Sequence, residues 1–139
     1  MMLTLDSAFP IPSNKRIKKE IYIGYINAIE ELKILLKNTC ESASLITDLW
    51  TAKSKYGYIG VTLHWLSKDF KVYDCFLYME YMPYPHIGVN IIFFLKKKVV
   101  EFGLEEKVTC VVTDNSSNMV NAIGQWEGIV HLLYTTYML

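Results

Sequence analysis

The first long segment of the chain carries apolar side chains at three- and four-residue intervals. This spacing runs through residues 13–38 and predicts one long helix. Ser13 stands at its start, where a hydroxyl side chain caps the free backbone N–H groups of a helix. Residues 1–12 lack the pattern and end in Pro10-Ile11-Pro12, so we expect an irregular lead-in there.

Three apolar runs with the character of strands follow this helix. The first is 44–51, and the second, 58–66, alternates between apolar and smaller or more polar residues. The third, 70–81, comes directly after the turn-forming Ser67-Lys68-Asp69. Because the connections are short, the three strands are expected to form an antiparallel meander.

Helices and strands alternate in the remainder of the chain. A helix is predicted from Gly88 to residue 102, with Gly103 at the position that commonly ends a helix. The pattern then predicts a strand at 108–112, a helix at 115–124 and a fifth strand at 129–134. The fold class is therefore α/β with a mixed sheet.

Two aspartates stand in or beside these apolar strands. Asp48 lies inside the first strand and shares a face with Ile46 and Trp50, so a purely structural role would need a buried partner. Trp50 is expected in the core. Asp114 directly follows the fourth strand. Burying a carboxylate is costly unless a cation or hydrogen-bond donor meets it, so the pair suggests a shared metal site on neighbouring strands. For Asp114 there is an ordinary alternative, the capping of the helix that follows.

The sequence around the two aspartates resembles a known family. Thr47-Asp48-Leu49-Trp50-Thr51 and Thr113-Asp114-Asn115-Ser116-Ser117-Asn118-Met119 are similar to the two acidic motifs of hAT-superfamily transposases and of the BED zinc-finger proteins derived from them. Val61–His64 and Pro85–Ile91 also match, and the resemblance covers about residues 12–126. It implies an RNase H-like mixed sheet in which the first three strands are antiparallel. The first and fourth strands would be parallel neighbours, so that Asp48 and Asp114 face each other.

The resemblance also implies a chemistry for these residues. Asp48 and Asp114 would be catalytic ligands of Mg²⁺ or Mn²⁺ in the cleavage and transfer of DNA strands. Asn115, Asn118 and His131 would support the site or contact nucleic acid. Where the family usually has Cys-x-x-His, this chain has His131 and Tyr134.

The family's third catalytic carboxylate lies far downstream, beyond a helical insertion. Glu105, Glu106 and Glu127 do not stand at that position. We therefore expect residues 13–139 to be the N-terminal part of an RNase H-like catalytic domain, truncated after the fifth strand. A BED finger, an insertion domain and a dimerisation segment are not expected in it.

Three functional interpretations follow. The leading one is a fragment or relic of a transposase catalytic domain that is inactive alone. The second is a domesticated, non-catalytic nuclear module that binds DNA or protein. The third is an unrelated α/β enzyme with an aspartate-centred phosphotransfer site, for which no paired Asp-x-Asp is present.

Composition and charge limit the class of protein and its cellular location. The 52% hydrophobic content excludes a disordered chain. Formal net charge is zero, so overall charge does not indicate nucleic-acid binding. The basic runs 15–19 and 96–98 are most simply solvated helix faces; the alternative is contact with phosphate, or for the first run a nuclear-localisation signal. Cys40, Cys75 and Cys110 lack zinc-ligand spacing. No apolar run is long enough to cross a bilayer, so we expect an intracellular protein without membrane association. The family resemblance implies a nuclear location, DNA as the partner, and a possible oligomer of the full-length parent protein.

Overall fold

The computed structural model describes residues 11–53 and 56–134. The chain divides into two units, Met1–Ile34 and Leu35–Leu139. Helix α1, Asn14–Thr39, begins in the first unit and ends in the second. The predicted lead-in falls mostly on residues 1–10, which lie outside the described residues.

Helix α1 begins as its sequence predicts. The backbone N–H of Arg16 donates to Ser13 Oγ at 3.3 Å, and that of Ile17 donates to the Ser13 carbonyl at 3.0 Å. Ser13 therefore satisfies backbone donors that a helix leaves free at its first turn. The side chains of the basic run 15–19 are exposed, as expected of a solvated face.

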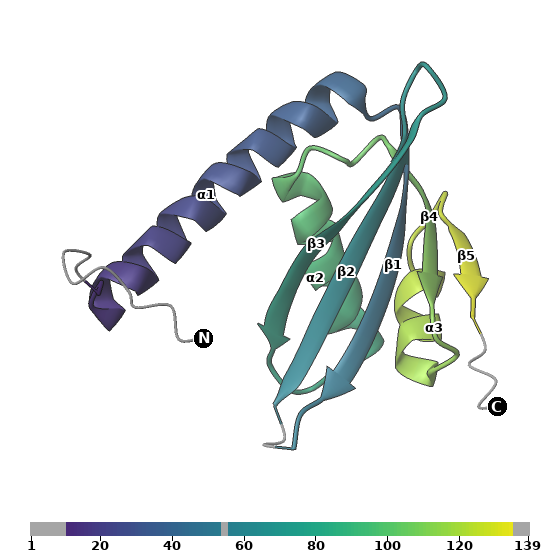
Figure 1. The fold of residues 1–139 in the computed structure, drawn as a ribbon. Helices are drawn as coiled ribbons and strands as arrows, with labels where there is room; N and C mark the ends of the chain where they lie inside the picture. The colour runs from purple at the N-terminus through teal and green to yellow at the C-terminus, as the bar shows by residue number, and fades with distance from the viewer. Residues whose placement is uncertain (1–10, 54–55, 135–139) are drawn as a thin grey trace, which may run out of the picture. The chain divides into compact units, whose positions relative to one another are not determined.

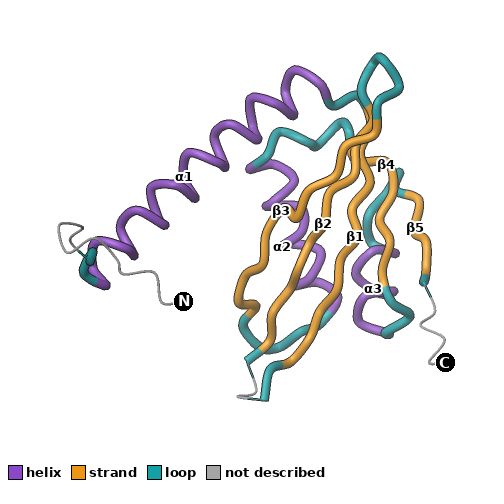
Figure 2. The backbone as a smooth tube through the Cα atoms, in the orientation of Figure 1, coloured by secondary structure: helices purple, strands orange, loops and turns teal. Residues whose placement is uncertain are grey.

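The second unit is built on one mixed sheet with the strand order β3-β2-β1-β4-β5 (Figures 1 and 2). Neighbouring strands β1, β2 and β3 are antiparallel, whereas β4 pairs parallel with both β1 and β5. This confirms the predicted RNase H-like arrangement, with the first and fourth strands side by side. The strands are β1 Ser42–Thr51, β2 Gly57–Leu66, β3 Val72–Met82, β4 Val108–Thr113 and β5 Val130–Leu133.

Two helices, α2 (Gly88–Glu101) and α3 (Ser117–Gly124), cover one face of the sheet (Figure 1). The last turn of α1 also joins the core of this unit through Leu36, and Trp65 Nε1 donates to Thr39 Oγ1 at 3.0 Å. No helix in the described part of the chain is both long and apolar enough to span a bilayer. The largest fully buried core side chains are Leu36, Leu45, Ile59, Val61, Leu63, Ile91, Leu95, Leu104, Val111, Met119 and Ile123.

Two predicted boundaries were wrong by a few residues. Phe70 was expected to begin the third strand, but it has a φ of 58° and its N–H donates to the Ser67 carbonyl at 3.0 Å. It therefore belongs to the turn, and β3 begins at Val72. Helix α3 begins at Ser117 rather than at residue 115, because a turn at Asp114 precedes it.

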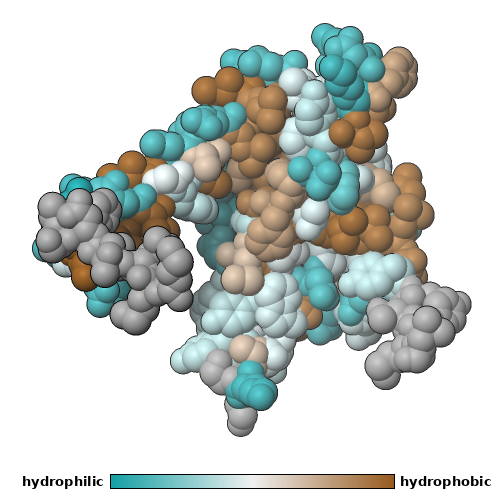
Figure 3. Space-filling model, viewed as in Figure 1, coloured by the Kyte–Doolittle hydropathy of each residue, from teal (hydrophilic) through white to brown (hydrophobic). Residues whose placement is uncertain are grey.

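The other face of the sheet carries no helix from the described residues of this unit, and we call it the open face. Along β1, Leu45 and Thr47 are buried beneath the helices, and Asp48 and Trp50 alternate with them onto the open face. Trp50 is 39% exposed, so its expected core position was wrong. Asp48 is exposed too and needs no buried partner. Because α2 and α3 lie behind the sheet in Figure 1, Figure 3 shows the open face, with apolar residues gathered over parts of it.

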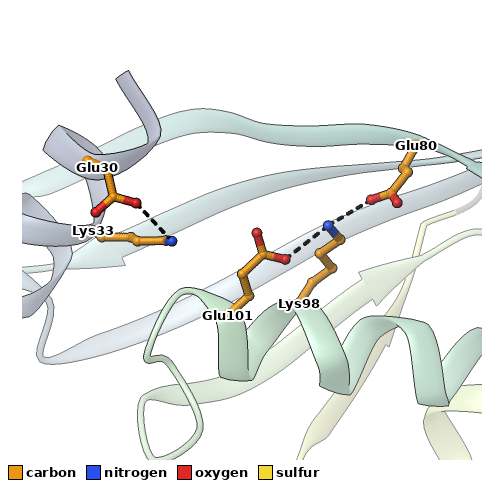
Figure 4. Close-up of polar contacts among 5 residues, drawn as sticks. All are labelled: Glu30, Lys33, Glu80, Lys98 and Glu101. Carbon is orange, nitrogen blue, oxygen red and sulfur yellow. Dashed lines mark hydrogen bonds and ion pairs between the residues drawn. The ribbon is translucent and has the colours of Figure 1, made fainter. Parts of the chain in front are cut away.

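Lys98 departs from the expected solvated face of the run 96–98. Its side chain is only 15% exposed, and Nζ lies 2.7 Å from Glu80 Oε2 and 3.0 Å from Glu101 Oε2 (Figure 4). The same Nζ stands 5.3 Å from the centre of the Tyr78 ring. Burial lowers the pKa of Lys98, but hydrogen bonds to the two carboxylates outweigh it and leave the pKa above its usual value.

Replacing Lys98 with methionine is expected to lower the free energy of unfolding by about 1 kcal/mol, since both carboxylates remain partly hydrated. Because the pKa of Lys98 is raised on folding, its contribution is complete below its unfolded pKa of about 10.4 and is lost as pH rises through the folded value. Urea denaturation at neutral pH and above pH 11 would measure this. If the wild type and Lys98→Met are equally stable at neutral pH, the stabilising role of the Lys98 ion pairs is contradicted. Lys97→Met on the exposed neighbouring position is the matched control.

Candidate functional site

The parallel pairing of β1 with β4 brings the two predicted aspartates together. Ile46 is the register partner of Val112, and two residues after them stand Asp48, within β1, and Asp114, directly after the end of β4. Side chains two apart in a strand share a face, so both carboxylates lie on the open face. Asp48 is exposed and Asp114 is half-buried.

Tyr134 lies next to Asp114, on the side away from Asp48. Leu133 is the register partner of Thr113, and the Tyr134 N–H donates to the Thr113 carbonyl at 3.0 Å. Burial raises the pKa of the Tyr134 phenol, and the charges of Asp48 and Asp114 raise it further. Both carboxylates therefore act on one hydroxyl, which supports their convergence. Four residues therefore lie side by side across neighbouring strands of the open face, in the order Gly60, Asp48, Asp114, Tyr134.

In each carboxylate, only one oxygen accepts hydrogen bonds from described residues. Asp48 Oδ1 accepts the Leu49 N–H at 2.9 Å. Asp114 Oδ1 accepts both the N–H and the hydroxyl of Ser116, at 3.2 and 2.8 Å. Within residues 11–53 and 56–134, neither Oδ2 accepts a hydrogen bond and neither carboxylate forms an ion pair. Each aspartate thus presents one free oxygen to a cation.

The alternative of helix capping by Asp114 was wrong in its detail. The N-cap residue of α3 is Ser116, with an extended backbone at φ −69° and ψ 139°. Asp114 stands two residues earlier and closes a local turn through Ser116. This turn accounts for one oxygen of Asp114 and leaves the other free.

The threonine before each aspartate is a positioning residue that the sequence interpretation missed. Thr47 and Thr113 are fully buried on the helix-covered face. Thr47 Oγ1 donates to the Gly60 carbonyl at 3.1 Å, and Thr113 Oγ1 donates to the Asp114 carbonyl at 2.8 Å. Both hydroxyls therefore fix the backbone that carries an aspartate. The repeated Thr-Asp dipeptide was the available signal.

The structure places His131 away from the two carboxylates. Its register partner is Val111, which is buried, so the imidazole lies on the helix-covered side of β5. His131 Nε2 stands 2.8 Å from Thr113 Oγ1. Because the single proton of that hydroxyl goes to the Asp114 carbonyl, Nε2 donates. His131 thus contacts Thr113, the residue that positions Asp114, and does not lie on the open face that carries the two carboxylates.

Asn115 and Asn118 are both exposed near the start of α3. Neither side chain forms a hydrogen bond with another described residue. Their role in contacting nucleic acid therefore stays a prediction.

The donor set suits a hard divalent cation. The described residues contain no group of three or more His, Cys, Asp or Glu side chains placed to hold a metal. Two carboxylates are nevertheless sufficient for Mg²⁺, which retains several waters and binds few protein oxygens. The cysteines Cys40, Cys75 and Cys110 are all free thiols.

The fold and the facing aspartates define an RNase H-like domain. The family described as the ZBED1 RNase-like domain matches residues 46–131, more than half of the chain. The chain belongs to this family and is a transposase-derived domain of the hAT type. The matched range begins in β1 and ends in β5, and so includes both aspartates.

Among known proteins, two from Zea mays, named as the AC transposase and the AC9 transposase, are each 27% identical over 114 residues. These alignments cover 82% of this chain and 14% of each relative. A protein of Talaromyces stipitatus named as the transcriptional regulator tpeD is 28% identical over 91 residues, which is 64% of this chain and 11% of that protein. The chain thus spans less than one sixth of the relatives it matches.

Proposed function

We propose that residues 42–134 form the divalent-metal-binding part of a DNA strand-cleavage and strand-transfer site. The observation that carries the proposal is the meeting of Asp48 and Asp114 on the open face, each with one free oxygen. Two carboxylates so placed repel each other unless a cation lies between them. The names of the Zea mays relatives support DNA as the substrate.

Each part of the site has a separate task in this proposal. Asp48 and Asp114 would hold Mg²⁺ or Mn²⁺, which when bound neutralises charge on phosphoryl oxygens and activates the attacking oxygen. Leu49 N–H and Ser116 orient the two carboxylates. Thr47 links β1 to the Gly60 carbonyl of β2, and Thr113 holds the carbonyl of Asp114 itself.

We further propose that the domain by itself binds metal and DNA without cleaving DNA. Only two carboxylates converge at the site among residues 11–53 and 56–134. Loss of one member of an interdependent catalytic set lowers rates by orders of magnitude. A nuclear location is part of the same proposal, since DNA is its substrate.

A non-catalytic module that binds DNA or protein in the nucleus is the second candidate. One observation favours it, the 28% identity to a protein named as a transcriptional regulator. Under this alternative the fold would be retained as a binding surface and the aspartates would have no metal to hold.

Direct measurement of Mn²⁺ binding by electron paramagnetic resonance tests the proposal. We expect one bound Mn²⁺ in the wild-type chain, with affinity at least about tenfold lower in Asp48→Asn and in Asp114→Asn. Asp74→Asn is the matched control, because Asp74 is an exposed carboxylate on β3, opposite His64. Unchanged binding in both site variants would contradict the metal site and favour the non-catalytic module.

A further inference from the structure

Four aromatic rings gather on the open face next to the two aspartates. We call Tyr56, Tyr58 and Tyr81 the tyrosine shelf, because these three rings line one shallow hollow of about 250 Å³. The Tyr81 ring meets Tyr56 edge to face at 5.6 Å and Tyr58 at 6.2 Å. Tyr56 and Tyr81 are exposed, and Tyr58 is half-buried.

Trp50 connects the tyrosine shelf to the aspartates. Its ring stacks on Tyr58 with centroids 6.3 Å apart and an interplanar angle of 26°. The indole also lies over Gly60, where an added Cβ would stand only 3.0 Å from it. Gly60 is the register partner of Asp48, so the absence of a side chain at this position leaves room for the indole next to the residue paired with Asp48.

Trp50, which stacks on the tyrosine shelf, lies close to the acidic pair. Trp50 follows Asp48 by two residues on the same face of β1, a separation of about 7 Å along the strand. This is about two base steps of a stacked nucleic-acid strand. A strand whose phosphate is held by a cation at the aspartates would therefore bring neighbouring bases to the shelf.

The exposure of these rings is not explained by packing of the described fold. Aromatic rings bury large apolar areas when they stabilise a core, whereas a cluster left exposed marks an interaction surface. The hollow is smaller than the roughly 300–1,000 Å³ typical of drug-sized ligands, and it suits a single flat ring. Lys53, exposed in the turn between β1 and β2, adds a positive charge near this end of the sheet.

We propose that the tyrosine shelf binds the unpaired bases of single-stranded DNA next to the acidic pair. The choice of DNA as occupant rests on the proposed function. Bases in a duplex have their faces covered by their neighbours, so only an unpaired strand offers the flat surfaces that tyrosine rings stack on. Such stacking tolerates any base sequence.

Fluorescence anisotropy with a labelled oligothymidylate of roughly ten nucleotides, within the usual site size of such proteins, tests the proposal. The wild-type chain is expected to bind this probe more tightly than a duplex of equal length at the same salt concentration. Replacing Tyr58 and Tyr81 together with leucine is expected to weaken single-strand binding at least about tenfold. Equal affinity of this variant and the wild type would overturn the proposal, as would equal affinity for duplex in the wild type.

Two further variants separate stacking from folding. Tyr58→Phe with Tyr81→Phe keeps the rings and is expected to retain binding within about twofold, because stacking does not need the hydroxyl. If this variant loses as much affinity as the leucine variant, stacking is not the cause and the proposal fails. Tyr84→Leu is the matched control, since Tyr84 is 87% exposed and lies outside the shelf.

The outcome is distinguishable from that of the metal-site experiment. Asp48→Asn is expected to lose Mn²⁺ affinity, whereas the variant with leucine at Tyr58 and Tyr81 is expected to keep its Mn²⁺ affinity and to lose affinity for oligothymidylate. If the aspartate variants lose Mn²⁺ binding but the shelf variants bind oligothymidylate as tightly as the wild type, the proposal for the shelf fails and the metal site stands. Wild-type single-strand binding that depends on the shelf, with unchanged Mn²⁺ affinity in both aspartate variants, would contradict the metal site alone.

Discussion

Truncating Leu95 to alanine is expected to lower the free energy of unfolding by about 2–5 kcal/mol. Leu95 lies on α2, and its side chain is 0% exposed in the layer between helices and sheet. Removing its branched end deletes apolar contacts and leaves a cavity that the rigid sheet cannot close. Urea denaturation followed by circular dichroism measures the change.

The control for this prediction lies on the same helix. Phe93 is 71% exposed, so Phe93→Ala removes a larger side chain and is expected to cost less than about 1 kcal/mol. If both substitutions destabilise the domain equally, α2 does not pack against the sheet through the face described above. That result would refute the placement of the core.

Replacing Asp48 with asparagine is expected to stabilise the metal-free domain and to remove its response to Mn²⁺. The substitution relieves repulsion from Asp114, worth about 0.5 kcal/mol because Asp48 is exposed. At a free Mn²⁺ concentration about one hundred times the dissociation constant, the wild-type domain gains about 2.7 kcal/mol. The variant is expected to gain much less, so the order of stability of the two proteins reverses when metal is added.

Thermal unfolding of both proteins with and without Mn²⁺ would show this reversal. Asp74→Asn changes the same charge elsewhere on the sheet and should leave the metal response intact. An Asp48→Asn protein that is stabilised by Mn²⁺ as strongly as the wild type would refute the role of Asp48 as a ligand. A metal-free variant that is less stable than the wild type would show that Asp48 contributes to the fold.

Much of the fold was readable because local patterns agreed with the final structure. Alternating apolar residues in β2 predicted which side chains face the helices, and Ile59, Val61, Leu63 and Trp65 are all buried. Gly103 has a φ of 65°, a conformation that glycine adopts without strain, so the end of α2 was also predictable. Boundary errors arose at Phe70 and Asp114, where turn geometry overrides the strand or helix pattern.

The burial of β1 could not be read from the sequence. Ile46 and Trp50 are apolar, and an apolar residue in a strand predicts the core unless one face of the sheet has no cover. Only the arrangement of α2 and α3 on one side shows that the other face is open within the described unit. The same arrangement places Asp48 and the tyrosine shelf on a single accessible surface.

The sequence by itself determined the elements, their order and the two aspartates as candidates, because these depend on local spacing and residue type. The tertiary structure decided what those residues meet. The parallel register of β1 and β4 places Asp48 beside Asp114, and the pairing of β5 adds Tyr134 on the site face while His131 contacts Thr113 on the other. Since a shift of one residue in either pairing would move these side chains to the opposite face, no local pattern could establish the site.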